Sequence, residues 1–234
     1  MATRTALITG ASRGLGLALA KELSRNGWTL VVDARGKDAL DAAVKELDPA
    51  AKVVAISGDV TDPKHRAALA DAAKSQGGLD LVVNNASALG PSPLPHLLDY
   101  PLDALEEVLK ANVVAPLGVL QTVRPHMKAG ARVINITSDA GREAYEGWGG
   151  YGSSKAALEQ LSAVLAEENE DFTVYWVDPG DMNTQMNQDA YPGEDISDKA
   201  LPEEAVPGLM QIIEGDLPPG RYKAQEMNEE PESS

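Results

Sequence analysis

A tyrosine and a lysine four residues apart are the first candidates for chemistry in this sequence. Tyr151 and Lys155 lie in the stretch YGSSK, and helical spacing would place the phenol and the ammonium on one face, one turn apart. Solvated helices commonly carry such a pair. A cation about 5 Å from the phenol, at an effective dielectric constant of about 20, contributes about 3 kcal/mol and would lower the phenol pKa from about 10 to about 8. The pair could therefore exchange a proton near neutral pH if the fold places it in a binding site.

A glycine-rich turn near the start of the chain is a candidate phosphate site. The segment TALITGASRGLGLALAKEL reads as a strand, a turn and a helix, with glycines at positions 10, 14 and 16. Gly10 permits a sharp turn, Gly14 lets the backbone approach a pyrophosphate, and Gly16 lets the helix pack against the sheet. The free N–H groups and the dipole at the start of the helix favour an anion. Taken alone, the pattern could also be an ordinary strand–helix turn.

The elements that must position these residues alternate between strands and helices. Short apolar runs predict strands at 5–9, 29–34, 52–57, 79–85, 131–137, 172–177 and, more weakly, 220–224. Segments rich in Ala, Leu, Glu and Lys predict helices at 14–26, 37–47, 63–75, 101–127, 153–169 and 202–214. This alternation predicts an α/β fold: one Rossmann-type, doubly wound, mainly parallel sheet of about seven strands with helices on both faces. The domain is expected to span 1–225, and the polar, acidic tail 226–234 is expected to be disordered.

Composition restricts the class of protein. Of the 234 residues 43% are hydrophobic, which is enough for one sizeable core, and the net charge is -16. No basic stripe is visible, which argues against a nucleic-acid partner. No apolar run could span a bilayer and no charged-then-apolar leader opens the chain, so we expect no membrane association and a cytoplasmic location. Cysteine is absent and the three histidines are scattered, so no metal site is expected.

Taken jointly, the motifs resemble the short-chain dehydrogenase/reductase family. The glycine turn has the family's T-G-x-x-x-G-x-G spacing, and Ser138 precedes Tyr151 by the usual thirteen residues. The segment NNAS at 84–87 is similar to the family's N-N-A-G, with Ser87 in place of the last glycine, where we expect an ordinary backbone conformation. DPGDMNT at 178–184 is similar to the P-G-x-x-x-T segment that closes over the cofactor. The resemblance covers about residues 3–185 and leaves the substrate unidentified.

The resemblance implies an NAD(P)-dependent oxidoreductase that moves a hydride between nicotinamide and a carbonyl or alcohol carbon of a small organic substrate. It implies that Tyr151 is the acid/base, that Lys155 tunes it and binds the nicotinamide ribose, and that Ser138 holds the substrate oxygen. Asn112 would support a water that links Lys155 to solvent, although an Asn inside a helix can also merely bond backbone. The expected cofactor contacts are Gly10, Ser12, Arg13, Gly14, Leu15, Gly16, Arg35, Asp59, Val60, Asn85, Ala86, Tyr151, Lys155, Pro179, Gly180 and Thr184.

The end of the second strand predicts a preference for NADP(H), with NAD(H) as the alternative. In the family, the acidic residue that selects the unphosphorylated cofactor usually occupies the place of Ala34, and phosphate-binding members often have an Arg where Arg35 follows. Arg13 is the second basic residue that such members commonly show, and a guanidinium binds phosphate bidentately. Asp33 stands one place too early, and strand alternation turns it away from the side that faces Ala34. The alternative is that both arginines are surface residues and that Asp33 binds the ribose.

Two other functions remain open. A dinucleotide-binding sensor or scaffold without turnover would typically lack part of the catalytic set, and this chain has all four residues. Isomerases or dehydratases among the family's extended relatives usually carry a longer sugar-binding region, whereas only about fifty residues follow Gly180.

The sequence also leaves alternatives for how the protein assembles and for which residues contact the substrate. Apolar stripes on the helices predicted at 101–127 and 153–169 resemble those that pair family members into four-helix bundles, which predicts a homodimer or homotetramer; the stripes could also pack only on the sheet. Tyr145, Trp148 and Met182 could line an apolar substrate pocket or could be packing residues.

Overall fold

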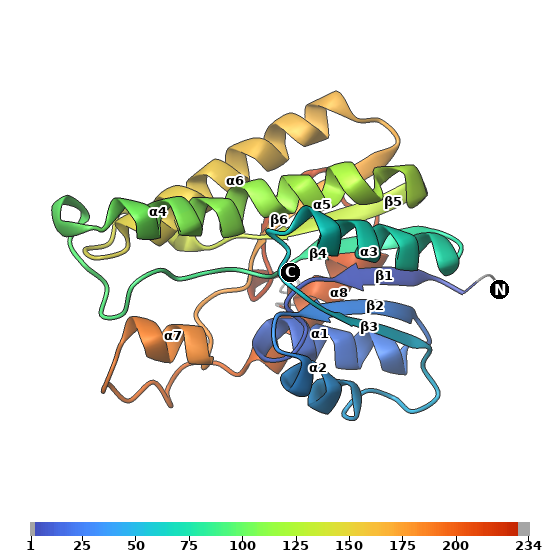
Figure 1. The fold of residues 1–234 in the computed structure, drawn as a ribbon, viewed down its shortest axis with the longest axis horizontal. Helices are drawn as coiled ribbons and strands as arrows, with labels where there is room; N and C mark the ends of the chain where they lie inside the picture. The colour runs from blue at the N-terminus through green and yellow to red at the C-terminus, as the bar shows by residue number, and fades with distance from the viewer. Residues whose placement is uncertain (1–2, 229–234) are drawn as a thin grey trace, which may run out of the picture.

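A seven-stranded parallel sheet forms the centre of the protein in the computed structural model, which describes residues 3–228 (Figure 1). The strands are β1 (Thr5–Ile8), β2 (Thr29–Ala34), β3 (Val53–Ser57), β4 (Leu79–Asn84), β5 (Met127–Ile136), β6 (Phe172–Asp178) and β7 (Gly220–Lys223). Their order in the sheet is β3-β2-β1-β4-β5-β6-β7, and each neighbouring pair is parallel. The strand order reverses between β1 and β4, which is where doubly wound sheets bind their ligands. The predicted fold class is confirmed.

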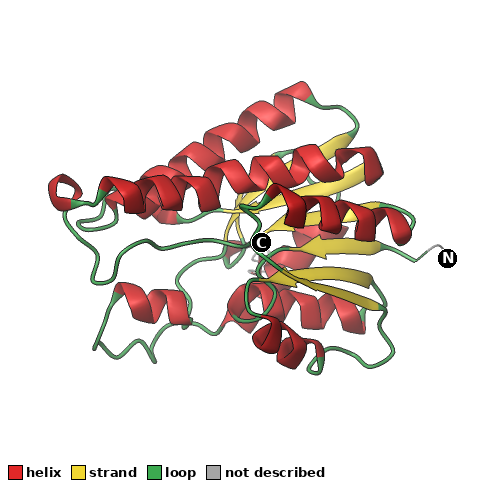
Figure 2. Ribbon diagram, viewed as in Figure 1, coloured by secondary structure: helices red, strands yellow, loops and turns green. Residues whose placement is uncertain are grey.

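Helices cover both faces of the sheet (Figure 2). They are α1 (Gly14–Arg25), α2 (Lys37–Val44), α3 (Pro63–Ser75), α4 (Leu102–Leu109), α5 (Ala115–Val123), α6 (Gly149–Glu168), α7 (Gln185–Ala190) and α8 (Pro202–Glu214). Helices α1, α2 and α8 pack in one core with Ile8 and Val32, whereas α3, α5 and α6 pack in a second core with Leu7 and Val31. Consecutive residues of β1 and β2 thus belong to opposite cores. Burial on both faces explains why these strands read as continuous apolar runs.

The helix predicted at 101–127 is interrupted. Between α4 and α5 the residues Lys110–Val114 form a π-helical turn, with Asn112 at its centre, and the helical segment closes with a 3-10 turn at Arg124–His126. Single π-turns inside α-helices are frequent at functional sites. The apolar periodicity continues through the interruption, so the sequence pattern did not reveal it.

Helix α6 begins at Gly149, four residues before the predicted start at 153. Glycine is a poor helix former, and three glycines in this stretch hid the first turn. Packing requires two of them: a Cβ at Gly150 would lie 2.3 Å from Cζ of Tyr100, and one at Gly152 would lie 2.5 Å from the carbonyl oxygen of Ala140. Close contacts with Tyr100, ahead of α4, and with Ala140, in the loop before α6, therefore fix where α6 begins.

The end of the described chain packs on the domain. Glu226–Asn228 form a short 3-10 helix, and Met227 packs against the core that contains α8. These are the first three residues of the tail that the sequence predicts to be disordered, and positions 229–234 of that tail lie outside the described residues. Within the described part of the chain, no helix is long and apolar enough to cross a membrane.

Candidate active site

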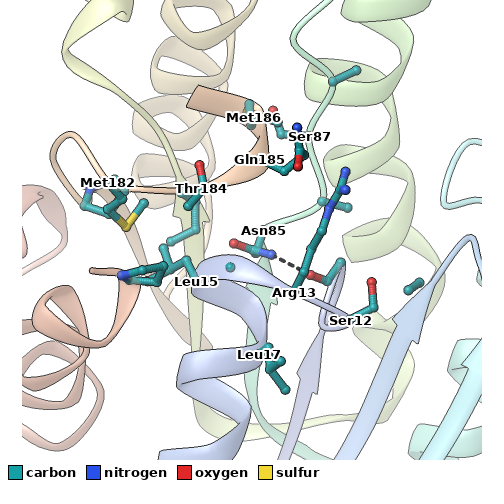
Figure 3. Close-up of a pocket in the computed structure, with 18 of the residues that line it drawn as sticks. Ser12, Arg13, Leu15, Leu17, Asn85, Ser87, Met182, Thr184, Gln185 and Met186 are labelled. Atoms are coloured by element: carbon teal, nitrogen blue, oxygen red, sulfur yellow. Dashed lines mark hydrogen bonds between the residues drawn. The ribbon is translucent and has the colours of Figure 1, made fainter. Parts of the chain in front are cut away.

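A cavity of about 900 Å³ opens at the carboxyl end of the sheet, over the point where the strand order reverses. The turns that follow β1 to β6 all contribute to its wall. Every predicted site residue lines this cavity except two, Gly16 and Asn112. Figure 3 shows the part of the wall formed by the glycine-rich turn, Asn85 and the segment from Met182 to Met186.

The glycine-rich turn is held in a conformation that needs glycine. Gly10 and Gly14 have φ of +69° and +55°, in the left-handed region. A Cβ at Gly16 would lie 2.5 Å from the carbonyl oxygen of Gly10, so this position must also be small. Asn85 donates from Nδ2 to that same carbonyl over 3.1 Å, which ties the turn to the loop after β4. The sharp turn expected at Gly10 and the close packing expected at Gly16 are therefore observed, whereas the pyrophosphate role of Gly14 stays a prediction.

The start of α1 faces the cavity with its backbone donors free. Arg13 is the N-cap residue, its side chain makes no capping hydrogen bond, and no acidic residue occupies the first turn. The first N–H groups of a helix lack partners within the helix, and the helix dipole adds a partial positive charge. Such a helix start is suited to binding an anion.

Two arginines lie at the outer rim of the cavity near the end of β2, and Asp59 is the acidic residue whose pKa the charge of Arg35 helps to lower. Arg13 and Arg35 are exposed and line the cavity, and Arg13 extends from the turn into it (Figure 3). Neither arginine forms an ion pair with any other residue that the structure describes. Ala34, at the place of the family's acidic residue, is buried. This end of the cavity therefore has two guanidinium groups available for a phosphate.

Asp33 is buried and bound to the protein itself. Its Oδ1 accepts the Gly10 N–H over 2.8 Å, and its Oδ2 lies 2.9 Å from Nε2 of His65. The contact with His65 was not predictable from the sequence, because the two residues are distant along the chain. Asp33 lies in the cavity wall beside Arg35, and each of its carboxylate oxygens has a hydrogen bond with the protein.

Tyr151 and Lys155 lie on one face of the first two turns of α6, as the spacing predicts. Their exposed fractions are 8% and 2%. Nζ of Lys155 lies 5.3 Å from the centre of the Tyr151 ring and donates to the carbonyl oxygen of Ile136 over 2.8 Å. Both side chains line the cavity. This separation of ammonium and ring is close to the distance of about 5 Å assumed from the sequence.

Burial reverses the direction expected for the phenol pKa. Removal from water raises the pKa of Tyr151, a hydrogen bond with Ser87 offsets part of this, and the charges of Asp178 and Asp139 raise it further. Burial also lowers the pKa of Lys155 to about 8, which weakens its charge as a partner at alkaline pH. The expected phenol pKa near 8 is therefore wrong for these residues by themselves. The cost of burying a charged phenolate outweighs the Coulomb attraction of the lysine.

Ser138 follows β5 and shares the cavity wall with Tyr151. Its Oγ donates to Oδ1 of Asp139 over 2.9 Å and accepts the Ala140 N–H over 3.2 Å, as the N-cap of a 3-10 helix over Asp139–Gly141. The hydroxyl has to rotate away from Asp139 before it can donate to a substrate oxygen. Asp139 at this place therefore sets the resting orientation of the hydroxyl.

Asn112 has a fully used side chain. Its Oδ1 accepts from the Ser87 hydroxyl and the Ala88 N–H, and its Nδ2 donates to the Ala88 carbonyl and to Oγ of Ser154. Four hydrogen bonds are all that an amide side chain can make. The side chain fixes the loop after β4, and the support of a water expected from Asn112 stays a prediction. Ser87 itself has an ordinary backbone conformation, as expected.

A buried ionic network that the sequence analysis did not predict lies behind Ser138. Glu159 accepts from Thr137 and from Arg142 and Arg221, each over 2.9 Å. Arg221, on β7, also pairs with Asp178 over 3.0 Å. Glu159 follows Lys155 by four residues, so it continues the same face of α6. The network ties the ends of β5 and β6, and the loops that follow both strands line the cavity.

Aromatic side chains gather beside Tyr151. The Trp148 ring lies 5.6 Å from the ring of Tyr151 and 6.0 Å from that of Tyr191, measured between centroids. Trp148 and Met182 line the cavity, which agrees with their expected place in a pocket wall. Tyr145 does not; it donates to Asp139 over 2.9 Å and is 43% exposed.

Comparison with known proteins gives a consistent result. A family model described as short chain dehydrogenase matches residues 4–195. The short chain dehydrogenase asqE of Emericella nidulans is 35% identical over 178 residues, which are 72% of this chain and 65% of that relative, so the chain spans less than two thirds of it. A solved short chain dehydrogenase from Pseudomonas syringae has a TM-score of 0.89 at 28% identity, covering 95% of this chain and 94% of that one. An alcohol dehydrogenase from the archaeon Thermococcus sibiricus, complexed with 5-hydroxy-NADP, has a TM-score of 0.85 at 26% identity, covering 99% and 100%.

Proposed function

Since the chain belongs to the short-chain dehydrogenase family, whose members are oxidoreductases, we propose that it is NADP(H)-dependent and uses Tyr151 as its acid/base. Its reaction is the transfer of a hydride between nicotinamide and a carbonyl or alcohol carbon of a small organic substrate. One observation carries this proposal: Tyr151, Lys155 and Ser138 share a single cavity with the anion-binding turn. The carboxyl-end position of that cavity is where this type of sheet places its chemistry.

The side chains divide the work of reduction as follows. A bound nicotinamide supplies the hydride. Tyr151, whose pKa is raised, keeps its proton at neutral pH and donates it to the substrate oxygen as that oxygen gains charge. Ser138 holds the same oxygen through its hydroxyl. The Lys155 ammonium, close to the ring face, stabilises the phenolate that remains.

The preference for NADP(H) is supported by the rim of the cavity. A phosphate on the adenosine ribose would meet Arg13 and Arg35, which have no competing ion pair among the described residues, and would meet no carboxylate at Ala34. In a protein of net charge -16, local positive charge is what an anionic ligand needs. The similar archaeal alcohol dehydrogenase, complexed with 5-hydroxy-NADP, adds support.

The proposal is tested with purified protein and a panel of aldehydes, ketones and alcohols, followed by nicotinamide absorbance with both cofactors. We expect turnover with NADP(H) to exceed turnover with NAD(H). Replacing Arg13 and Arg35 together by Ala should weaken NADPH far more than NADH. The matched control replaces Arg25 and Arg124, which are exposed and lie outside the cavity, so that the same net charge is removed.

Two results would contradict the proposal. A preference for NADH, or a cofactor ratio that the double replacement leaves unmoved, would refute the cofactor assignment. Tight cofactor binding without turnover on the whole panel would favour the non-catalytic sensor instead.

We also propose that the protein assembles as a homodimer or homotetramer through the face formed by α4, α5 and α6. Two apolar side chains on this face are exposed, Val114 at 58% and Val164 at 40%. Helices α4 and α6 lie in contact, so the face is continuous (Figure 1). A cytoplasmic location stays a prediction from the sequence.

A further inference from the structure

A buried contact between Asp33 and His65 lies beneath the adenosine end of the cavity. Asp33 is the second-last residue of β2 and is 1% exposed, and His65 lies in the first turn of α3 and is 7% exposed. One carboxylate oxygen accepts the Gly10 N–H over 2.8 Å and the other lies 2.9 Å from Nε2 of His65. An ionised carboxylate only accepts hydrogen bonds, so the imidazole proton stands on Nε2.

The end of β3 is shaped to admit this imidazole. A Cβ at position 58 would lie 2.2 Å from Nδ1 of His65, which no side chain could tolerate. Gly58 therefore leaves the space in which the ring crosses from α3 to β2. The backbone of Asp33 is fixed as well, because its carbonyl accepts the Ala11 N–H over 2.8 Å. Three segments thus hold one carboxylate in one orientation.

This carboxylate is placed where it could decide between the two cofactors. Asp33 lines the same cavity as Arg35. A carboxylate at the end of the second strand of such a sheet accepts hydrogen bonds from ribose hydroxyls and repels a phosphate attached there. Here each oxygen has one hydrogen bond with the protein, which holds the carboxylate against the glycine turn and α3.

We propose that His65 is a specificity-determining positioning residue. By holding the Asp33 carboxylate against the glycine turn, it keeps this acidic group from repelling an adenosine phosphate that Arg13 and Arg35 would bind. This inference rests on the proposed NADP(H) preference and adds a residue that does not touch the cofactor. A merely structural contact would change the stability of the fold and would weaken both cofactors alike, whereas the positioning role changes their ratio.

The test measures dissociation constants of NADPH and NADH by titrating the nicotinamide fluorescence, without any substrate. His65→Leu removes the donor and keeps the bulk, so the Asp33 carboxylate gains a free oxygen that ribose hydroxyls can use. We expect the NADPH-to-NADH preference to fall by about tenfold, the contribution of one hydrogen bond to a charged group. His65→Gln keeps an N–H at the distance of Nε2 and should retain the wild-type ratio.

Variants of Asp33 provide the second part of the test. Asp33→Asn removes the charge and should leave the preference within about threefold of wild type, because the charge is held away from the ligand. In His65→Leu combined with Asp33→Asn, the preference for NADPH should return, because no carboxylate is left to be freed. Circular dichroism confirms that each variant is folded; should His65→Leu not fold, the Asp33→Asn and His65→Gln measurements carry the test.

Each outcome separates this inference from the proposed function. A wild type that prefers NADPH, with an unmoved ratio in a folded His65→Leu, overturns the role of His65 and leaves the function standing. An increase of more than about tenfold in NADPH preference in Asp33→Asn overturns it too, because the charge would then face the phosphate. A wild type that prefers NADH refutes the cofactor assignment and this role together. Absence of turnover, with the binding ratios as expected, refutes only the oxidoreductase function.

Discussion

Replacing Lys155 by Met should stabilise the protein near neutral pH while it removes catalysis. Burial lowers the pKa of Lys155 from 10.5 to about 8. This difference means that the buried ammonium destabilises the folded protein by about 3 kcal/mol at neutral pH. Met has a similar length and carries no charge. The replacement also loses the bond to the Ile136 carbonyl, which leaves a buried acceptor unpaired at a cost of about 1–2 kcal/mol. The net expectation is a gain of about 1–2 kcal/mol in the free energy of unfolding.

The stability advantage of the Met variant depends on pH. Because the pKa of Lys155 is lower in the folded than in the unfolded protein, the unfolded chain binds more protons between about pH 8 and 10.5, and the stability of the wild type rises through that window. The Met variant has no such gain. Its advantage should therefore shrink by about 2 kcal/mol between about pH 7 and about pH 9.5.

Urea unfolding followed by circular dichroism, at those two pH values, measures the difference. The matched control is Lys45→Met, an exposed lysine outside the cavity, which should show no comparable change with pH. Turnover and cofactor affinity are measured on the same samples, and both should fall in Lys155→Met. A variant that is less stable than the wild type at both pH values, or a stability difference that does not depend on pH, would refute the reasoning that burial of the charge is costly.

Three further expectations follow from the same site. Tyr151→Phe keeps the ring and loses the hydroxyl, so kcat should fall by about 10²–10⁴-fold while fluorescence titration shows intact cofactor binding; near wild-type turnover would mean that another group carries the proton. The kcat/KM for carbonyl reduction should decline as pH rises through about 8, because Lys155 loses the charge that supports the phenolate, and a profile that stays flat to about pH 9.5 would contradict this. Light scattering at micromolar concentration should give at least twice the monomer mass of 24.7 kDa, and a monomer would exclude the proposed assembly.

The fold was largely predictable because strands that are buried on both faces of a parallel sheet appear in the sequence as continuous apolar runs. The predicted strand at 29–34 and the helix at 63–75 have the observed bounds, since both combine continuous or periodic apolar residues with clear turn signals. The interrupted helix around Asn112 was not predictable, because a π-helical turn does not break the apolar periodicity. The early start of α6 was missed because its glycines, unfavourable for a helix, are required by contacts with distant residues.

The candidate site was predictable in its residues and less so in its energetics. The motif residues around Gly10, Ser138 and Tyr151 meet in one cavity, because the topology brings strand ends together. The partners His65 and Glu159 were missed, since such contacts join residues far apart in the chain. The direction of the Tyr151 pKa was wrong because spacing reveals a neighbouring charge but not the depth of burial.

The ionic network through Arg221 affects the order in which the candidate active site is assembled. Arg221 is synthesised after Ser138, Tyr151 and Lys155, yet it pairs with both Glu159 and Asp178. Until strand β7 docks, Asp178 lacks this cation and Glu159 keeps only that of Arg142, so the ends of β5 and β6 are not yet tied together. A nascent chain that has emerged only as far as α8 therefore already contains the tyrosine, the lysine and the serine, but not yet the arginine that links these two strand ends. Proteolytic removal of this last strand from a finished molecule would reverse the same step, so the protein's activity would report the integrity of its C-terminal segment.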